Sequence, residues 1–423
     1  MHRSTLTGSA LVALGALFVA SWMGTAGADK KGGYVETDLV VGGPDANQAT
    51  KTLKDANGIT HTANFFDKNL VNSWGLVGTA TGSPFWISDN GVGLSTLYSV
   101  NPSSSSPPQG QPSLTRVVSI PPPGDTSATF GSPTGVVFNT TSTSPAAQQE
   151  FKITGFLFTS SCSKTTATAT FLFATEDGTI VGWNSNLYPT LVLCQAATTA
   201  GTNNNGIIQI NNSAMGKGAV YKGLAIATDG TGATFLYVTN FRAGTVEKYD
   251  GGFNLVDTFT DPKLPRHYAP FNVVPIKLNG SMVPKLFVTF AVQNAARHDD
   301  VAGQGHGIVD TFDLTGNMLQ RFAQHGQLDS PWGVALTPAN FGELSGTLWI
   351  GNFGNGQINA YHPDSGKFIS KVRDSKGKSI VIDGLWAITF GSGLLNGGSS
   401  NTLYFTAGPN GETDGLFGSL NPD

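Results

Sequence analysis

The chain has 423 residues, of which 24 are Lys or Arg and 28 are Asp or Glu, so its net charge is −4. Charged residues make up 12% of the chain, about half the usual ~25%, and 54 residues are Gly, which disfavours coiled coils and helical bundles. The even charge balance argues against a basic groove for nucleic acid, and 26 Phe, 9 Tyr and 7 Trp residues supply the material for a folded core.

Residues 1–28 have the pattern of a secretory signal peptide. A short basic start precedes an apolar stretch at residues 10–20 and the small-residue sequence AGA at 26–28. The apolar stretch is shorter than the ~20 residues that span a bilayer, which makes an uncleaved anchor the weaker alternative. We therefore expect a secreted or periplasmic protein that has no membrane span after cleavage.

A two-part pattern recurs six times in the rest of the chain. Its first half is a turn that enters a short strand, and its second half is an aromatic or aliphatic strand that ends in small or polar residues. The first halves are SWGL at 73–76, PTGV at 133–136, YKGL at 221–224, PFNV at 270–273, PWGV at 331–334 and LWAI at 385–388. The second halves begin at Phe85, Phe171, Leu236, Leu286, Leu348 and Leu403.

This spacing predicts an all-β fold, a six-bladed β-propeller that forms a single domain over residues 29–423. The blades would start near residues 72, 132, 220, 269, 330 and 384, with room in each step for four strands and their loops. The last unit lacks its outer strand, so an N-terminal strand at 34–41 is expected to complete it and close the ring. Residues 42–63 read as a polar surface loop, and a β-sandwich with long loops is the alternative fold.

The two cysteines, Cys162 and Cys194, both lie in the second unit, which is enlarged by insertions around 160–170 and 195–214. In an oxidising compartment they could form a disulfide that joins the loops of this unit. Two buried free thiols are the alternative.

Five sequence strings together resemble those of a known family. They are NLVNSWGL at 69–76, FATEDGTI at 173–180, YAPFNV at 268–273, GNFGNG at 351–356 and DGLWA at 383–387. The family consists of exported, mostly bacterial proteins of uncharacterised function and is distantly similar to NHL-repeat propellers. The resemblance implies a six-bladed fold and no particular reaction. Some members of the family carry a C-terminal sorting tail, and because this sequence stops at Asp423 without one, we expect a released protein.

In a propeller, the turn before the innermost strand and the turn after the second strand lie at the same end, here called the mouth. Aromatic faces beside amides and carboxylates would suit an uncharged or weakly polar ligand, such as a sugar or a cyclic ester. The expected ligand-binding residues are Trp74, Asn90, Glu176, Lys222, Asn240, Phe271, Trp332, Asn352 and Trp386. Alternatively, each Asn caps its own turn and each Trp fills the space between blades.

Three of these residues, Glu176, Asn240 and Asn352, are also candidate metal ligands. They offer hard oxygen donors from three units, and propellers of the gluconolactonase and paraoxonase type hold Ca²⁺ at the mouth with such side chains. A bound Ca²⁺ would polarise a carbonyl group and activate water. The analogy rests on architecture, because no sequence motif of those enzymes is present.

The candidate catalytic residues lie in a loop of the fourth unit and are His298, Asp299, Asp300 and His306. His titrates near neutral pH and neighbouring carboxylates tune it, so such a loop over the mouth could supply a general base. Streptogramin lyase, a propeller enzyme that acts on a cyclic ester, uses His in this general way. A mobile polar loop without a catalytic role is the alternative.

Serine-hydrolase, zincin, P-loop and CxxC motifs are absent from the sequence. We therefore expect a monomeric, exported propeller that acts as a binding scaffold through its mouth, with a small molecule, a glycan or an envelope or extracellular protein as its partner and no nucleic acid. The alternative is a metal-assisted hydrolase or lyase of lactone or ester substrates on the same scaffold.

Overall fold

The computed structural model describes residues 32–102 and 113–423, so the expected signal peptide lies outside the described residues. Nearly all regular structure in the described part is β-strand, and most strands belong to four-stranded antiparallel sheets. The predicted all-β class is therefore confirmed. None of the helices in the described ranges is long and apolar enough to cross a membrane.

Five sheets have four antiparallel strands each, in which neighbours follow the order of the chain. The first comprises β5 (Ser73–Val77), β6 (Phe85–Asp89), β7 (Leu94–Ser99) and β8 (Ser113–Ser119). The second comprises β9 (Pro133–Phe138), β12 (Phe171–Thr175), β13 (Thr179–Trp183) and β15 (Ile207–Asn211). The third comprises β16 (Tyr221–Thr228), β17 (Thr234–Asn240), β18 (Thr245–Tyr249) and β19 (Leu255–Phe259). The fourth and fifth comprise β20 (Tyr268–Ile276), β21 (Lys285–Val292), β22 (Gly307–Phe312) and β23 (Met318–Gln324), and β24 (Pro331–Leu336), β25 (Leu348–Asn352), β26 (Ile358–Tyr361) and β27 (Phe368–Lys371).

The sixth sheet contains strands from both ends of the described chain. Its order is β28 (Leu385–Phe390), β29 (Leu403–Ala407), β30 (Gly415–Pro422), β1 (Tyr34–Gly42) and β4 (Phe65–Phe66). β1 runs antiparallel to β30, with Tyr34 opposite Pro422 and Gly42 opposite Gly415. The strand expected at residues 34–41 thus forms, and it pairs with the last strand of the chain.

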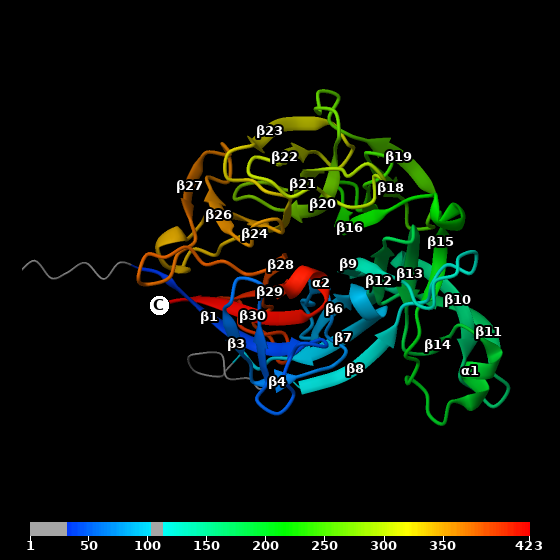
Figure 1. Cartoon of the computed structure of the whole chain (residues 1–423). Helices are drawn as coiled ribbons and strands as arrows, with labels where there is room; N and C mark the ends of the chain where they lie inside the picture. The colour runs from blue at the N-terminus through cyan, green and yellow to red at the C-terminus, as the bar shows by residue number, and fades with distance from the viewer. Residues whose placement is uncertain (1–31, 103–112) are drawn as a thin grey trace, which may run out of the picture. The chain divides into compact units, whose positions relative to one another are not determined.

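The innermost strands of the six sheets contact one another in sequence. β5 contacts β9, β9 contacts β16, and the series continues through β20, β24 and β28, which in turn contacts β5. Figure 1 shows β9, β16, β20, β24 and β28 toward the middle of the described body, with β8, β19, β23 and β27 at its outside. Buried side chains such as Val246 of the third sheet and Ile308 of the fourth pack in one cluster between neighbouring sheets.

Four of the six recurring first halves have a glycine at their third position, and this glycine has a steric cause. A Cβ on Gly135 would lie 2.4 Å from the backbone nitrogen of Leu224, and one on Gly75 would lie 2.4 Å from the carbonyl oxygen of Thr134. Because both neighbours are backbone atoms of the next innermost strand, a side chain here would push two sheets apart. The close approach of innermost strands therefore depends on these glycines.

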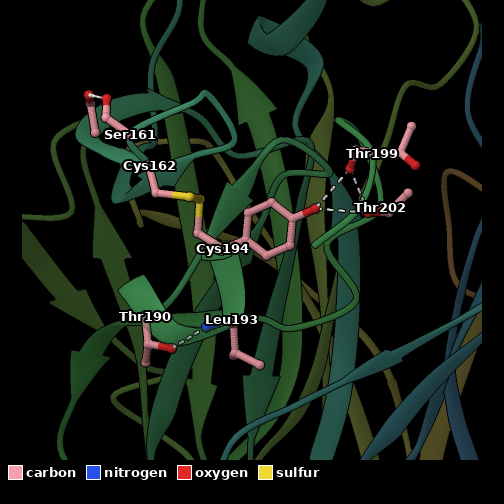
Figure 2. The surroundings of a disulfide bond; sticks show 9 residues. Ser161, Cys162, Thr190, Leu193, Cys194, Thr199 and Thr202 are labelled. Carbon is pink, nitrogen blue, oxygen red and sulfur yellow. Dashed lines mark hydrogen bonds between the residues drawn. A yellow bond between two sulfur atoms is a disulfide. The ribbon is translucent and has the colours of Figure 1, made fainter. Parts of the chain in front are cut away.

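The insertions in the second unit form a separate small sheet. It contains β10 (Lys152–Leu157), β11 (Ser163–Thr168) and β14 (Leu187–Tyr188), and the short helix α1 (Leu191–Ala196) follows. Figure 2 shows the disulfide between Cys162 and Cys194, whose Cα atoms are 6.0 Å apart, and the Thr190 hydroxyl that accepts a hydrogen bond from the Leu193 N–H at the start of α1. The predicted disulfide is confirmed.

The prediction of an irregular surface loop at residues 42–63 is wrong in part, because β2 (Thr52–Lys54) and β3 (Thr60–Thr62) form a hairpin there. Both strands are short and polar, but Leu53 and His61 are buried. Alternation over only three residues is too weak a signal to predict a strand. The remaining short elements are the 3₁₀ helices Asn90–Val92, Thr140–Thr143, Ala146–Gln148, Ala214–Gly216 and Gly342–Leu344, and the turn α2 (Pro409–Glu412).

Candidate functional site

Side chains from the beginnings of the innermost strands meet in one aromatic cluster. Trp74 and Trp386 stack with their ring centroids 3.5 Å apart, and Trp332 lies edge-on to both, at 6.3 and 5.9 Å. Phe271 contacts Trp74 and Trp386 at 6.5 and 5.8 Å. Four of the expected ligand-binding residues therefore lie together.

These aromatic side chains face one another and not the solvent. Trp74, Phe271, Trp332 and Trp386 are between 0 and 5% exposed. The Oδ1 atom of Asn72 accepts hydrogen bonds from Trp74 Nε1 at 2.9 Å and Trp386 Nε1 at 3.2 Å, which satisfies the polar edges of the stacked pair. Burial favours the interpretation in which these residues fill the space between the innermost strands.

Lys222 joins the aromatic cluster to a group of charged residues. Its ammonium group lies 5.0 Å from the ring centroid of Trp74, donates a hydrogen bond to Glu176 and lies 3.4 Å from Asp299 Oδ1. The side chain is 2% exposed. Burial alone would lower the pKa of Lys222, but the carboxylates of Glu176 and Asp299 outweigh it and hold that pKa above its usual value. Lys222 therefore stays charged in a buried position.

The surrounding residues complete what we call the Lys222 cluster: Lys222, Glu176, Asn90, His298 and Asp299. Asn90 Nδ2 donates to Glu176 Oε2 at 2.8 Å, and His298 Nδ1 lies 2.7 Å from Asp299 Oδ1. The His298 contact, together with the Lys222 charge, lowers the pKa of Asp299 to about 2. Asn90, Glu176, His298 and Asp299, all expected site residues, thus form one network around a buried ammonium group.

The other two candidates of the catalytic loop, Asp300 and His306, take no part in this hydrogen-bond network among the described residues, although Asp300 interacts electrostatically with Lys222 and Asp299. Burial raises the pKa of Asp300, while the half-buried His306 places its Nδ1 2.9 Å from the carbonyl oxygen of Val301 in its own loop. Only His298 and Asp299 of the four candidates contact one another or Lys222 in the hydrogen bonds described here.

Asn240 and Asn352 hydrogen-bond within their own surroundings. Asn240 Nδ2 donates to Glu247 at 2.7 Å and its Oδ1 accepts from the Ala243 N–H, which caps its turn. Asn352 Nδ2 donates to the carbonyl oxygen of Gln327 at 2.7 Å. The alternative in which each Asn caps or braces its own turn fits these contacts.

The predicted Ca²⁺ site fits this arrangement poorly. Glu176, His298 and Asp299 offer ligand atoms within 4.8 Å of one another, but the Lys222 ammonium contacts both carboxylates. A divalent cation would have to displace or face a buried positive charge, which is electrostatically costly. The prediction of a Ca²⁺ site formed by Glu176, Asn240 and Asn352 is therefore not favoured by these contacts, and it stays a prediction.

Glu412 was missed by the sequence analysis and faces the same charges. Burial, with the charge of Glu176, raises its pKa to about 7, and Lys222 opposes this effect. It belongs to α2, the turn after β29, where Asn410, Gly411 and Glu412 all have positive φ. The recurring pattern could have predicted Glu412, because the turns after the second strands of two other units supply Asn90 and Glu176, and Glu412 lies in the corresponding turn of the sixth unit.

A cavity of about 560 Å³ lies between later residues of the same six innermost strands. The fourth residue of each recurring first half lines it, which gives an aliphatic collar of Leu76, Val136, Leu224, Val273, Val334 and Ile388. Thr81, Thr140, Thr143 and Thr389 add hydroxyl groups, and Trp332 and Asn272 lie where the cavity approaches the aromatic cluster. None of the described residues that line it is charged.

The sheets and their packing define a β-propeller. No family model matches the chain. It is 25% identical over 371 residues to uncharacterized protein R648 of Acanthamoeba polyphaga mimivirus, which covers 86% of this chain and 78% of that protein. Two further uncharacterized proteins of the same virus, R640 and L690, are each 30% identical to the chain, over 234 and 227 residues. These matches include 53% and 52% of this chain but only 39% and 56% of the lengths of R640 and L690. These relatives do not support the resemblance to an exported bacterial family.

Similar solved structures have low sequence identity and modest overlap. They include a luciferin-regenerating enzyme (10% identity, TM-score 0.43, 84% of this chain and 92% of that one) and a protein of unknown function from Bacteroides thetaiotaomicron (10%, 0.46, 93% and 77%). A PQQ-bound aldose sugar dehydrogenase from Streptomyces coelicolor is similar at 11% identity and a TM-score of 0.38, over 84% and 95% of the two chains. At these scores the likenesses add nothing to what the sheets themselves establish.

Proposed function

We propose that the protein is a six-bladed β-propeller that binds an uncharged, mainly apolar small molecule in the cavity between its innermost strands. The observation that carries this proposal is the aliphatic collar, to which every innermost strand contributes one residue. The volume of about 560 Å³ lies within the range of ~300–1,000 Å³ typical of small-molecule sites. Binding would therefore occur beyond the aromatic cluster and not on its faces.

The blade number and the closure of the ring are supported by contacts between strands. Six sheets supply six innermost strands, and the last of them, β28, contacts the first, β5. The pairing of β1 with β30 would close the ring in the manner of other propellers, by joining the two ends of the chain in one blade. Residues 29–423 would form this single domain.

An extracytoplasmic location is part of the proposal. The disulfide between Cys162 and Cys194 supports it, because disulfides persist mainly in oxidising compartments. The signal-peptide pattern at residues 1–28 points the same way.

The chemistry of the lining predicts the class of ligand. Leu76, Leu224 and Ile388 would gain from apolar contact, at ~25 cal/mol for each Å² removed from water. A charged group would find no partner among the described lining residues and would lose its hydration. Hydroxyl groups such as those of Thr81 and Thr389 could accept or donate one or two orienting hydrogen bonds.

A hydrolase or lyase of lactone or ester substrates at the mouth is the second candidate. It is supported by His298 and Asp299 beside the buried Lys222, and by Glu412, whose pKa burial raises to about 7. This alternative would use acid and base groups without a metal, because the Lys222 ammonium already neutralises Glu176 and Asp299. Turnover of a lactone and ester panel, lost in His298→Gln, would support it over simple binding.

Titration with the fluorescent apolar probe N-phenyl-1-naphthylamine tests the proposal. The wild-type chain should bind it saturably, and Val334→Phe, which places a ring into the cavity, should weaken binding at least tenfold. Val283→Phe is the matched control, because Val283 lines a separate surface depression with Met282 and Leu319. Absence of saturable binding, or binding that is lost in Val283→Phe and kept in Val334→Phe, would refute the proposal.

A further inference from the structure

A second polar cluster lies where β1 meets the β2–β3 hairpin. It comprises Glu36 and Asp38 of β1, Asp55 in the hairpin turn and His61 of β3. His61 Nδ1 lies 3.1 Å from Asp38 Oδ1 and 3.7 Å from Glu36 Oε1, and its Nε2 lies 3.6 Å from Asp55 Oδ2. β1 and β3 are in contact, and Figure 1 shows them side by side in blue. Three carboxylates thus surround a single imidazole.

Much of this cluster is buried, and several of its atoms make no hydrogen bond within the described ranges. The side chains of Asp55 and His61 are 0 and 3% exposed. Glu36 Oε1, Asp55 Oδ2 and His61 Nε2 make no hydrogen bond within the described ranges. Burying three carboxylates against one imidazole is costly, because a buried charge needs a partner that compensates it.

We propose that Glu36, Asp38 and His61 bind a divalent transition-metal ion such as Zn²⁺. One ligand atom from each residue lies within 4.8 Å of the others, so small side-chain movements could bring all three to the ~2.0–2.2 Å typical of Zn²⁺ ligands. Nδ1 is the imidazole atom that faces both carboxylates. Three protein ligands would leave a fourth position for water.

Asp55 completes the arrangement as a positioning residue. A metal-bound His commonly donates its other N–H to a carboxylate, which fixes the ring orientation. Asp55 Oδ2 faces His61 Nε2 at 3.6 Å, and Asp55 Oδ1 is held by the Ile59 N–H at 2.6 Å. Asp38 is oriented similarly, because its Oδ2 accepts a hydrogen bond from the Thr62 N–H at 3.1 Å. Asp55 Oδ2 and His61 Nε2, which make no hydrogen bond among the described residues, gain a role in this scheme.

The donor set also predicts which ion binds and what it does. Zn²⁺ and Mn²⁺ accept mixed imidazole and carboxylate ligation, whereas Ca²⁺ prefers six to eight oxygen ligands. The ion would link β1, which pairs with β30, to the hairpin of residues 52–62. It would therefore stabilise the segment that joins the two chain ends. A protonated His61 that neutralises the carboxylates without a metal is the competing explanation.

Isothermal titration of the chelator-treated chain at pH 7 separates the two explanations. We expect one Zn²⁺ for each chain, little Ca²⁺ binding, and an affinity at least 100-fold lower in His61→Gln and Glu36→Gln. His298→Gln, which alters the Lys222 cluster, and His362→Gln, an exposed residue outside both clusters, should bind Zn²⁺ like the wild type. Glu36→Gln keeps the buried imidazole and is the informative variant if His61→Gln does not fold.

A Co²⁺ absorption spectrum provides a second readout that does not depend on activity. The wild type should show the d–d bands of a site with nitrogen and oxygen ligands, and Glu36→Gln should lose them. The proposal is overturned if the wild type binds no Zn²⁺, if Ca²⁺ binds as tightly as Zn²⁺, or if binding is lost in His298→Gln and kept in Glu36→Gln and His61→Gln.

Discussion

Replacing Lys222 by Met should destabilise the protein by about 3 kcal/mol. The substitution keeps an unbranched side chain of similar length against the Trp74 ring but removes the ammonium group. Among the described residues, Glu176 then loses the Lys222 ammonium and keeps the hydrogen bond that Asn90 donates to its Oε2 atom. Breaking a buried ion pair from one side costs about 3–5 kcal/mol, and the 12% exposure of the Glu176 side chain places this case at the lower end.

The double variant Lys222→Met/Glu176→Gln should recover most of this loss. A neutral amide no longer needs a counter-charge, and its oxygen can still accept the hydrogen bond from Asn90. Lys248→Met is the matched control, because Lys248 is also buried but donates to the carbonyl oxygen of Leu314, which keeps a second hydrogen bond from the Tyr237 hydroxyl. We expect this control to cost about 1 kcal/mol.

Urea-induced unfolding at pH 7, with the free energy of unfolding extrapolated to water, measures all four proteins on one scale. If the free energy of unfolding of Lys222→Met falls by less than ~1 kcal/mol, the argument is refuted, because leaving a buried carboxylate without its counter-charge should destabilise the protein by more than that. A double variant no more stable than the single variant would show that Lys222 and Glu176 are not energetically coupled.

Three further predictions concern other parts of the structure. Gly135→Ala should lower the free energy of unfolding in urea by about 2–3 kcal/mol, because its Cβ would meet the Leu224 backbone at 2.4 Å. Gly124→Ala is the control: its Cβ would meet nothing within 4 Å, and its stability should stay within ~0.5 kcal/mol of the wild type. Cys162→Ser/Cys194→Ser should make the insertion of β10, β11, β14 and α1 sensitive to protease by removing a link worth about 3–4 kcal/mol in the loop-entropy model, while probe binding in the cavity is unchanged. Burial raises the pKa of Glu412 from 4.5 to about 7, so the folded state binds this proton more tightly than the unfolded state does. The stability that the protonated carboxyl contributes is therefore lost as the pH rises from 4.5 through 7. Thermal melts of Glu412→Gln should show a weaker decline over that range than the wild type, even though Glu176, Asp300 and Lys222 also face this group.

The recurring motif predicted much of the fold because its signals are local. A turn and an apolar run over four residues identify each innermost strand, and four of the six also have a glycine at the third position. The glycine at 135 has a direct steric reason in the neighbouring backbone. The motif also predicted which turns would approach one another, as the contacts among Trp74, Phe271, Trp332 and Trp386 illustrate.

The direction of those side chains could not be predicted in the same way. Whether Trp74 faces a solvent-filled mouth or stacks on Trp386 depends on distances across the molecule, which four-residue patterns do not encode. The cluster of Glu36, Asp55 and His61 was missed for a related reason, since it depends on a polar hairpin folding back onto β1. The turn that carries Glu412 was also missed, because three successive residues with positive φ do not follow a common turn pattern that a sequence reveals.

The measurement that tests the central claim most directly is a crystal structure of the protein with bound N-phenyl-1-naphthylamine. The account predicts the probe between the six innermost strands, in contact with Leu76, Leu224 and Val334 of the aliphatic collar. A probe bound only at the surface depression of Met282, or over Lys222 at the mouth with the cavity empty, would contradict it.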